Sequence, residues 1–366
     1  MTALRVGLVG FGWVNREVWL PRLLRRGDCE VVAVHDPALA GSPSGLPRPV
    51  AVATGLPDLL ARGLNLVVVA VPNHLHEPIA GAVLDSGTTA LVEKPVCLTP
   101  QQLERLVRRA VTAGTGLQVS RPARHREDVR RVRALARELC TGPLRIRAEW
   151  LRSAGIPRPG SWFTSRAQAG GGALLDLGSH LAEAVQPMLA AGAPSALTAR
   201  LVESGAEAPG GYAGWRGDMA GAVGTIDVEV EGEFHATWAD GSSLFLRAAW
   251  VSDVPHDITR IEVQGTGRDG APCRIRLVTT FGFSPHRVAR PILRVEVAGR
   301  VTERPTTTTL GLEYDAQLDA AIELACGRAP WQAELRETAH VVALLDEAYV
   351  AAGRPLTAET AGASAC

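Results

Sequence analysis

The first fifteen residues most constrain the fold of this chain, because a glycine-rich turn follows directly after a short apolar strand. Leu4–Val9 reads as a buried strand, and Gly10 and Gly12 follow it before an amphipathic stretch that starts at Asn15. Glycines at these positions allow a tight turn and a close approach of phosphate to the backbone at a helix start. Asn15 stands where the pattern usually has a third glycine or alanine. The segment predicts a strand–turn–helix unit that binds a dinucleotide.

The alternation of strands and helices continues to about residue 120. Further strands are expected at Glu30–His35, Leu66–Val71, Ala90–Glu93 and Gly116–Val119, and helices at Asn15–Arg26, His76–Ser86 and Pro100–Ala113. Most of these strands are continuously apolar, which is typical of strands that are buried on both faces. The pattern predicts a doubly wound parallel sheet, a Rossmann fold, as an NAD(P)-binding domain over residues 1–122.

A different pattern begins after about residue 122. Helices are expected at Glu127–Leu139, from Ala173 to about Leu189, at Leu312–Cys326 and at Gln332–Ala352, and strands at Leu144–Leu151, Asp227–Trp238, Leu244–Val251, Arg260–Gln264 and Arg274–Thr279. Apolar and polar residues alternate over most of 194–302, which predicts an open, mostly antiparallel sheet with helices on one face. Residues 123–356 are thus expected to form an α+β domain for substrate binding and oligomerisation, and 357–366 a flexible tail.

Lys94 is the only lysine among the 38 lysine and arginine residues of the chain. Arginine stays protonated near neutral pH, whereas a desolvated lysine can lose and regain its proton. Lys94 also follows the expected strand Ala90–Glu93 at its carboxyl end, where open α/β sheets bind ligands. A cis Lys94–Pro95 bond would fix the lysine in a tight turn. We therefore predict proton transfer by Lys94; the alternative is a lysine that persisted by chance.

Asp176 and His180 follow the glycine triplet Gly170–Gly172 and lie four residues apart, so that a helix would place both on one face. An acid, an imidazole and the amine of Lys94 beside a nicotinamide would suit alcohol–ketone redox chemistry, in which one group must carry the hydroxyl proton. A structural Asp–His pair is one alternative. A zinc site is another, but no third ligand is evident, and no metal is expected.

The adenosine end of the cofactor is expected at Asp36, which ends the second strand at the usual distance from the glycine turn. Its carboxylate would repel a 2′-phosphate, and the next residue is Pro37 rather than arginine. NAD is therefore favoured over NADP. Arg48, in the following loop, is the residue that could reverse this preference.

Four runs, GLVGFGW, AVPNHLHEPIAGAVLDSG, EKP and GGGALLDLGSH, resemble the glucose–fructose oxidoreductase and inositol dehydrogenase family (Gfo/Idh/MocA). The likeness extends over nearly the whole chain and departs at Asn15 and at Glu183, where aspartate is usual. It implies that Lys94, Asp176 and His180 are the catalytic trio, and leaves open which of Lys94 and His180 is the main acid/base. The expected cofactor contacts are Gly10, Phe11, Gly12, Trp13, Val14, Asp36, Pro37, Val71, Pro72, Asn73, His76, Glu93 and Lys94.

The loop from Trp150 to Phe163, just before the glycine triplet, is expected to form the substrate wall. Trp162 would supply a stacking face, and Arg124 or Arg152 would bind hydroxyls or anions of the substrate. The alternative is that Trp162 only packs and that the arginines are solvated.

These observations predict an NAD-dependent oxidoreductase that transfers hydride between nicotinamide and a secondary alcohol or ketone. The expected substrate is a sugar, nucleotide sugar or cyclitol, within secondary-metabolite or antibiotic biosynthesis. One alternative is a lyase or glycosidase that recycles NAD within each turnover, and another is a non-catalytic NAD-sensing partner protein.

The net charge and the cysteines indicate which partners and which cellular compartment to expect. The net charge is zero and basic residues are interleaved with acidic ones, so neither nucleic acid nor an anionic membrane is the expected partner. The sequence has no apolar run near the ~20 residues that span a bilayer and no signal-peptide layout. The six cysteines form no CxxC pair. A cytoplasmic location with reduced thiols is expected.

Assembly is predicted from the antiparallel sheet, one face of which should lack a helical cover. Phe234, Trp238, Phe245 and Trp250 lie in its strands, and some of them would make that face apolar. A large exposed apolar face is rare on a soluble monomer. We therefore expect a homodimer or homotetramer formed through this sheet, as the resemblance also implies.

Overall fold

The computed structural model describes residues 3–39, 50–203 and 224–356. Arg48 and the tail 357–366, which the sequence analysis singled out, lie outside these ranges. Contacts divide the chain into two compact units. Among the described residues, unit 1 contains those up to Ser120 together with Tyr314–Arg336, and unit 2 contains Arg121–Glu313 together with 337–356.

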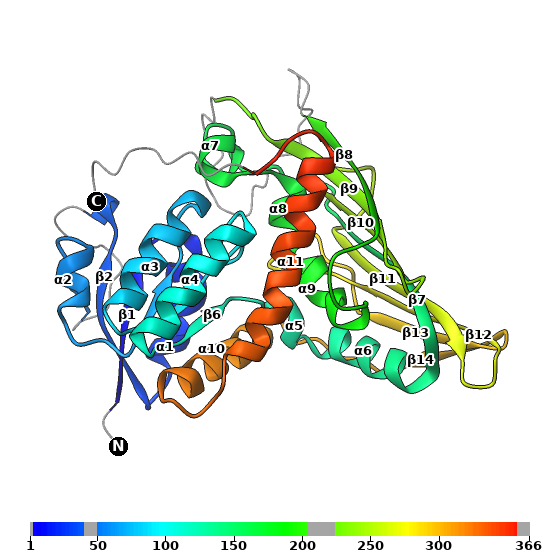
Figure 1. The fold of residues 1–366 in the computed structure, drawn as a ribbon, viewed down its shortest axis with the longest axis horizontal. Coiled ribbons are helices and arrows are strands. Elements are labelled where there is room, and N and C mark those ends of the chain that lie inside the picture. The colour runs from blue at the N-terminus through cyan, green and yellow to red at the C-terminus, as the bar shows by residue number, and fades with distance from the viewer. Residues whose placement is uncertain (1–2, 40–49, 204–223, 357–366) are drawn as a thin grey trace. The chain divides into compact units, whose positions relative to one another are not determined.

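Unit 1 is built on a six-stranded parallel sheet in the order β3-β2-β1-β4-β5-β6 (Figure 1). Its strands are β1 (Leu4–Val9), β2 (Cys29–His35), β3 (Ala51–Val52), β4 (Leu66–Val69), β5 (Thr89–Val92) and β6 (Leu117–Val119). Every residue of β4 and β5 is buried, as expected for strands covered on both faces. Between strands lie α2 (Leu56–Leu60), α3 (His76–Asp85) and α4 (Pro100–Ala113), with short 3-10 turns η2 (Pro37–Leu39) and η3 (Asn73–Leu75). The predicted Rossmann fold is confirmed.

The helix after the glycine turn differs from the single helix predicted at Asn15–Arg26. It begins as a π-helical segment, η1 (Val14–Trp19), and continues as α1 (Leu20–Leu24). Pro21 lies in the first turn of α1. Proline has no N–H and its ring displaces the carbonyl four residues earlier, so a regular α-helical ladder cannot run through this point.

Unit 1 also contains α10 (Leu312–Ala325) from Tyr314 onward, a segment that the sequence analysis placed in the second domain. Its side chains explain the grouping. Asp315 pairs with Arg22 at 2.9 Å, and the Tyr314 ring lies edge-on to Trp19 at 5.7 Å between centroids. A Cβ on Gly116 would lie 2.7 Å from Leu324, so this glycine permits the close packing of α10 against the sheet.

Unit 2 is built on an eight-stranded sheet in the order β14-β13-β12-β11-β7-β10-β9-β8. The strands are β7 (Cys140–Leu151), β8 (Ala196–Glu203), β9 (Glu229–Thr237), β10 (Ser243–Ala249), β11 (Ile258–Gly267), β12 (Pro272–Thr279), β13 (Ile292–Val297) and β14 (Arg300–Arg304). All neighbours are antiparallel except β7 and β10. The predicted mostly antiparallel sheet is confirmed.

Helices of unit 2 lie on one face of this sheet (Figure 1). They are α5 (Pro122–His125), α6 (Glu127–Leu139), α8 (Ala173–Asp176), α9 (Gly178–Val185) and, from Glu337 onward, α11 (Gln332–Ala351), with shorter segments η4 (Trp162–Thr164), α7 (Arg166–Ala169) and η5 (Gln186–Met188). The predicted helix from Ala173 to about Leu189 is thus broken at Leu177 and again after Val185.

The opposite face of the sheet is charged, and the prediction of an apolar face was wrong. Phe234, Trp238 and Trp250 are buried within unit 2, and only Phe245 of the four aromatic residues is half-exposed. Outward-facing arginines and glutamates instead pair across strands, as in Arg247–Glu231 at 2.9 Å. Further pairs are Arg200–Glu233, Arg260–Glu149, Arg276–Glu262, Arg274–Glu296 and Arg294–Glu303.

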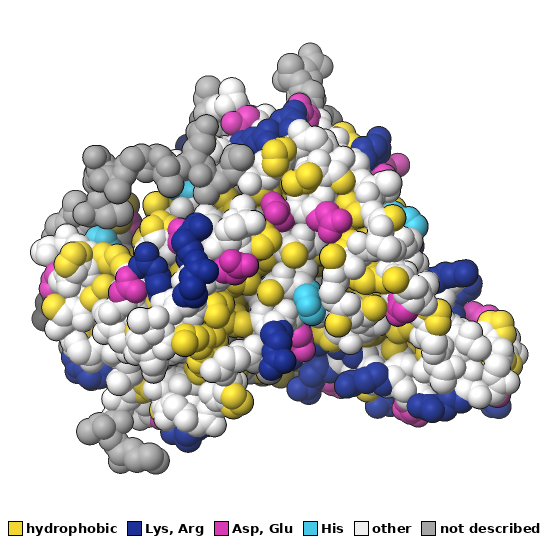
Figure 2. Space-filling view, viewed as in Figure 1, with side chains coloured by type: hydrophobic (Ala, Val, Ile, Leu, Met, Phe, Trp, Pro, Cys, Tyr) yellow, Lys and Arg dark blue, Asp and Glu magenta, His cyan; other side chains and the backbone are white. Residues whose placement is uncertain are grey.

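Charges of both signs are interspersed on the surface drawn in Figure 2. Within the described residues, no helix is long and apolar enough to cross a membrane.

Candidate functional site

The glycine turn of unit 1 has the geometry that a bound pyrophosphate needs. Gly10 has a φ of 80°, and a Cβ there would lie 2.2 Å from the carbonyl oxygen of Ala70. Its N–H donates to the His35 carbonyl at 2.8 Å, which fixes the turn against β2. A Cβ at Gly12 would meet no atom within 4 Å, so this side of the turn is open to a ligand. The turn therefore fits a dinucleotide phosphate.

Asn15, which stands where the pattern usually has a third glycine or alanine, forms hydrogen bonds to the turn. Its side chain is fully buried, and its amide donates to the carbonyls of Val9 at 3.1 Å and Gly10 at 2.6 Å. These two bonds tie the start of η1 to the end of β1. The Val9 carbonyl also accepts the N–H of Ala70 at 2.9 Å, so the Asn15 amide adds a second bond there.

Asp36 lies next to the glycine turn at the end of β2. Its carboxylate accepts the N–H of Phe11 at 2.6 Å and that of Ala38 at 2.8 Å, one on each oxygen. Each carboxylate oxygen retains a lone pair that can accept a ribose hydroxyl. The side chain is thus held in place before any cofactor binds.

The other predicted cofactor residues follow β4 and β5, which lie beside β1 in the sheet. Val71, Pro72 and Asn73 come after β4. His76 is buried and its two ring nitrogens lie 2.6 Å from the Pro95 carbonyl and 2.9 Å from the Val71 carbonyl. Burial lowers the pKa of His76 to about 4. His76 therefore joins the turn after β4 to the turn that holds Lys94.

Glu93 and Lys94 follow β5, and the Lys94–Pro95 bond is cis. Glu93 accepts the indole N–H of Trp19 at 2.8 Å and the N–H of Lys94 at 3.2 Å, one on each carboxylate oxygen. Burial raises the pKa of Glu93. All predicted cofactor residues thus meet at the carboxyl edge of β2, β1, β4 and β5, where ligands of open α/β sheets bind.

In unit 2, Asp176 and His180 stand out because both are half-exposed in a stretch that is otherwise buried. Asp176 is the last residue of α8, and His180 lies in the first turn of α9. The Asp176 carboxylate accepts the indole N–H of Trp250 at 3.0 Å. Two polar side chains that emerge from a buried segment are the arrangement expected of a reactive site.

Trp150 and Arg152, at the end of β7, lie beside this pair. The Trp150 ring is 5.6 Å from the His180 ring, and the Arg152 guanidinium is 5.2 Å from the Trp150 ring. Arg152 is buried, and this burial lowers its pKa, while the charges of Asp176 and Asp257 act in the opposite sense. Both residues belong to the stretch from Trp150 to Phe163 that was expected to form the substrate wall, but only Arg152 was predicted as a substrate ligand.

Other residues that the sequence analysis named have partners of their own. Arg124 pairs with Glu337 at 2.5 Å, and the Trp162 ring stacks on Phe163 at 3.7 Å. Glu183 pairs with buried Arg121 at 3.1 Å, and burial raises its pKa. Among the described residues, no group of three His, Cys, Asp or Glu side chains could hold a metal ion.

Comparisons with known proteins account for both units. A family model described as "Oxidoreductase family, NAD-binding Rossmann fold" matches residues 4–121, and one described as "GFO/IDH/MocA C-terminal domain" matches residues 129–268. The chain belongs to the Gfo/Idh/MocA oxidoreductase family. It is therefore an NAD(P)-dependent oxidoreductase, as the sequence predicted, and the resemblance is confirmed.

Individual relatives of this Gfo/Idh/MocA protein modify sugars. A "Putative UDP-kanosamine synthase oxidoreductase subunit" of Amycolatopsis mediterranei (strain S699) is 37% identical over 364 residues, covering 96% of each chain. A D-glucoside 3-dehydrogenase of Escherichia coli (strain K12) is 30% identical over 51% of this chain and 54% of its own. The crystal structure of GenD2 from gentamicin A biosynthesis in complex with NAD superposes with a TM-score of 0.70 at 25% identity, covering 96% of this chain and 95% of that one.

Proposed function

We propose that this oxidoreductase transfers hydride between NAD and a secondary hydroxyl, or the corresponding ketone, of a nucleotide-linked sugar in antibiotic biosynthesis. The observation that carries the proposal is the 37% identity, over 96% of both chains, with the relative named as a UDP-kanosamine synthase oxidoreductase subunit. The similarity to GenD2 from gentamicin A biosynthesis supports the same class of pathway.

NAD, when bound, would supply the hydride acceptor or donor. Gly10 and Gly12 would receive its pyrophosphate, and Asp36 would bind the hydroxyls of the adenosine ribose. The proposal of NAD over NADP rests on the Asp36 carboxylate, which the N–H groups of Phe11 and Ala38 hold beside the turn. A 2′-phosphate at this point would meet a fixed negative charge.

Lys94 and His180 are proposed to carry the proton of the reacting hydroxyl. Lys94 follows β5 at the ligand-binding edge of the parallel sheet, and His180 is half-exposed beside Trp150. Asp176 would hold its negative charge near His180 and favour the protonated imidazole. Turnover of Lys94→Arg tests the role of the lysine.

Substrate binding is proposed for Arg152, together with Trp150. Arg152 is a buried cation near Asp176, and the buried Trp150 ring lies 5.2 Å from the guanidinium and 5.6 Å from the His180 ring. A planar guanidinium suits the hydroxyls of a pyranose, and the Trp150 ring packs against the guanidinium as a cation–π partner. Arg124 and Trp162 stay predictions for the same wall.

A substrate panel tests the proposal. Purified protein would be mixed with NAD and with UDP- or dTDP-linked hexoses, free hexoses or cyclitols, and NADH would be followed by its absorbance. We expect NADH with at least one nucleotide sugar and a lower kcat/KM with the matching free sugar. Activity with cyclitols alone would contradict the nucleotide-sugar assignment.

Single-turnover reactions separate the remaining alternatives. With protein in excess over substrate, an oxidoreductase leaves one NADH for each ketone formed. A lyase or glycosidase that recycles its cofactor would convert substrate without net NADH. NAD binding without conversion of any sugar in the panel would favour a non-catalytic NAD-sensing protein.

A further inference from the structure

The start of α8, the helix that ends at Asp176, is bound by a carboxylate from another element. One oxygen of Glu229, in β9, accepts the N–H of Gly172 at 2.8 Å and that of Leu174 at 3.0 Å. The first N–H groups of a helix have no partner within the helix. Gly172, the N-cap residue, has no side chain to supply one, so Glu229 takes that role from a distance.

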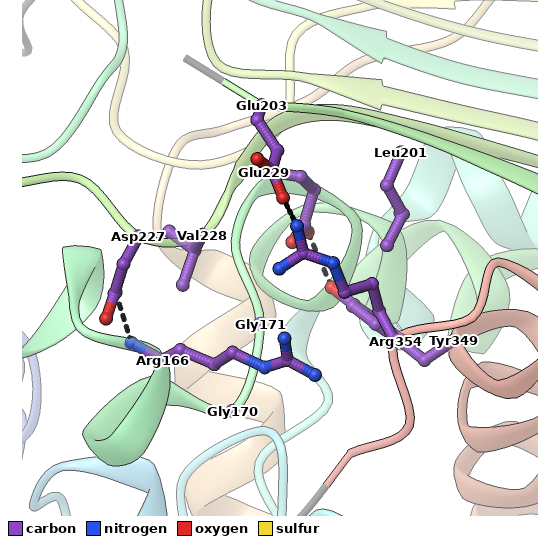
Figure 3. A pocket seen from close by; sticks show the side chains of 10 residues that line it. All are labelled: Arg166, Gly170, Gly171, Leu201, Glu203, Asp227, Val228, Glu229, Tyr349 and Arg354. Atoms are coloured by element: carbon purple, nitrogen blue, oxygen red, sulfur yellow. Dashed lines mark hydrogen bonds and ion pairs between the residues drawn. The ribbon is translucent and has the colours of Figure 1, made fainter. Parts of the chain in front are cut away.

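Tyr349, in α11, binds the start of α8 together with Glu229, and we call these two side chains the anchor. Its hydroxyl accepts the N–H of Leu175 at 3.1 Å and donates to the same Glu229 oxygen at 2.5 Å (Figure 3). Tyr349 and Glu229 are both buried, at 1% and 4% exposure. Two buried side chains from different elements therefore bind three of the N–H groups at the start of α8.

The glycines before α8 are needed for this contact. A Cβ on Gly171 would lie 2.3 Å from the Tyr349 hydroxyl, and a Cβ on Gly172 would lie 1.9 Å from the backbone oxygen of Glu229. No side chain could occupy either position without displacing the anchor. Packing in unit 2 thus requires glycine at two positions of the triplet, Gly171 and Gly172.

The other end of α8 is tied to the same strand. The Asp176 carboxylate accepts the Trp250 indole N–H at 3.0 Å, and the backbone N–H of Trp250 donates to the Val230 carbonyl at 2.9 Å. Val230 is the residue after Glu229 in β9. Contacts from Glu229 and Val230, two adjacent residues of β9, therefore hold both ends of α8, directly at its start and through Trp250 at its end.

Arg166, Glu203, Asp227 and Arg354 line a pocket beside Glu229 and Tyr349, and these charged groups have partners of their own. Arg354 pairs with Glu203, and the Arg166 N–H donates to Asp227 at 2.5 Å (Figure 3). The Arg166 guanidinium donates to the Pro355 carbonyl at 3.3 Å.

We propose that Glu229 and Tyr349 are positioning residues that set Asp176, and through the short turn at Leu177 also His180, for proton transfer. This inference rests on the proposed function of that pair. Buried hydrogen bonds hold the helix start in one place. A displacement of about 1 Å at a reacting group can cost roughly 100-fold in rate.

The test is Tyr349→Phe, which removes the hydroxyl and keeps the ring. We expect kcat to fall roughly 10- to 100-fold while KM for NAD stays within about twofold. Glu229→Gln keeps an oxygen that accepts both N–H groups, so its kcat should lie closer to wild type than that of Glu229→Ala. Leu345→Ala, which creates a cavity at a buried side chain of α11, is the control for lost stability. It should leave kcat unchanged below its unfolding temperature.

A readout without substrate keeps the two proposals distinguishable. The His180 imidazole can be titrated by NMR, with its signal assigned by comparison with His180→Gln. A looser Asp176 favours the charged imidazole less, so Tyr349→Phe should lower the pKa of His180 whereas Leu345→Ala should not. An unchanged His180 titration and unchanged kcat in Tyr349→Phe would overturn the positioning role. A shifted titration in a protein that converts no sugar would instead refute the proposed function.

Discussion

The two sheets of this protein keep their polar side chains in different places. In the parallel sheet, β4 and β5 are buried along their whole length, and the polar groups come after the strands end, as Asp36 and Lys94 do. In the antiparallel sheet, every second residue of the central strands faces the open side, where arginine and glutamate pair. Asp176 and His180 come from α8 and α9, which pack on the other face.

This difference shows where each sheet can support a binding site. A parallel sheet collects the ends of its strands at one edge, so its site follows from the strand order alone. An antiparallel sheet has no such edge. Its site depends on helices that pack on it, and each helix must be fixed by contacts from distant parts of the chain, as Glu229 and Tyr349 fix α8.

The largest expected effect on turnover is at Lys94, which follows β5 at the carboxyl edge of the parallel sheet. Lys94→Arg should lower kcat by about 10²- to 10⁴-fold, because arginine does not release a proton near neutral pH, while NAD affinity changes only a few-fold. Turnover rates and cofactor titrations measure the two effects. Arg108→Lys, at an exposed arginine in α4, is the matched control and should be silent. Near-normal turnover of Lys94→Arg would remove the lysine from the mechanism.

How much of this the sequence could predict differs between the two sheets. The continuous apolar runs gave the parallel sheet, and β1 was predicted at its observed bounds, Leu4–Val9. The break of the first helix at Pro21 and the grouping of α10 with unit 1 were missed, because neither alters the apolar periodicity. The Glu229–Tyr349 contact joins residues 120 apart, and no local pattern signals it.

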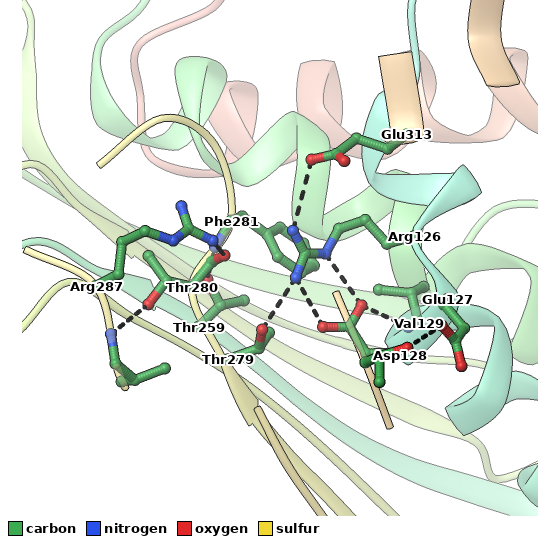
Figure 4. A network of polar contacts seen from close by, with 12 residues as sticks. Arg126, Glu127, Asp128, Val129, Thr259, Thr279, Thr280, Phe281, Arg287 and Glu313 are labelled. Carbon is green, nitrogen blue, oxygen red and sulfur yellow. Dashed lines mark hydrogen bonds and ion pairs between the residues drawn. The ribbon is translucent and has the colours of Figure 1, made fainter. Parts of the chain in front are cut away.

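The second prediction compares ion pairs on the two faces of the antiparallel sheet. Arg126 and Asp128 form a buried pair at 2.7 Å, and Arg126 also bonds Thr279 at 3.0 Å (Figure 4). Asp128→Ala leaves the buried guanidinium with Glu313, 3.6 Å away, as its remaining carboxylate partner, so the cost should lie near the lower end of about 3–5 kcal/mol. Glu303→Ala, on the open face, should leave the free energy of unfolding nearly unchanged, because exposed ion pairs contribute little. Urea unfolding of both variants measures the difference, and similar costs would mean that the faces do not differ in this way.

The third prediction concerns the cofactor. Asp36→Ala removes a ribose acceptor and a negative charge, so the ratio of kcat/KM for NAD to that for NADP should fall roughly 10- to 100-fold. Both cofactors would be titrated with wild type and mutant. The control is Asp58→Ala, a surface carboxylate of unit 1 that bonds Arg62. A wild type that already prefers NADP would show that Asp36 does not set the preference.

The smallest expected effect concerns assembly through the open face of the antiparallel sheet. That face carries Arg247–Glu231 at 2.9 Å and Arg200–Glu233 at 3.5 Å, and the Arg147 guanidinium lies 4.4 Å from the Phe245 ring. Alternating charges are self-complementary under a twofold axis, so we propose that two copies associate here as a homodimer or within a homotetramer.

Light scattering after size exclusion would give the mass. Because salt screens charged contacts, the dissociation constant should rise a few-fold between about 0.05 and 0.5 M salt, whereas an apolar interface would tighten or stay unchanged. Arg200→Glu, which places two like charges opposite each other beside Glu233, should weaken association further without unfolding the protomer. A monomer mass at micromolar concentration would refute the assembly, and a dimer indifferent to both salt and Arg200→Glu would locate its interface elsewhere.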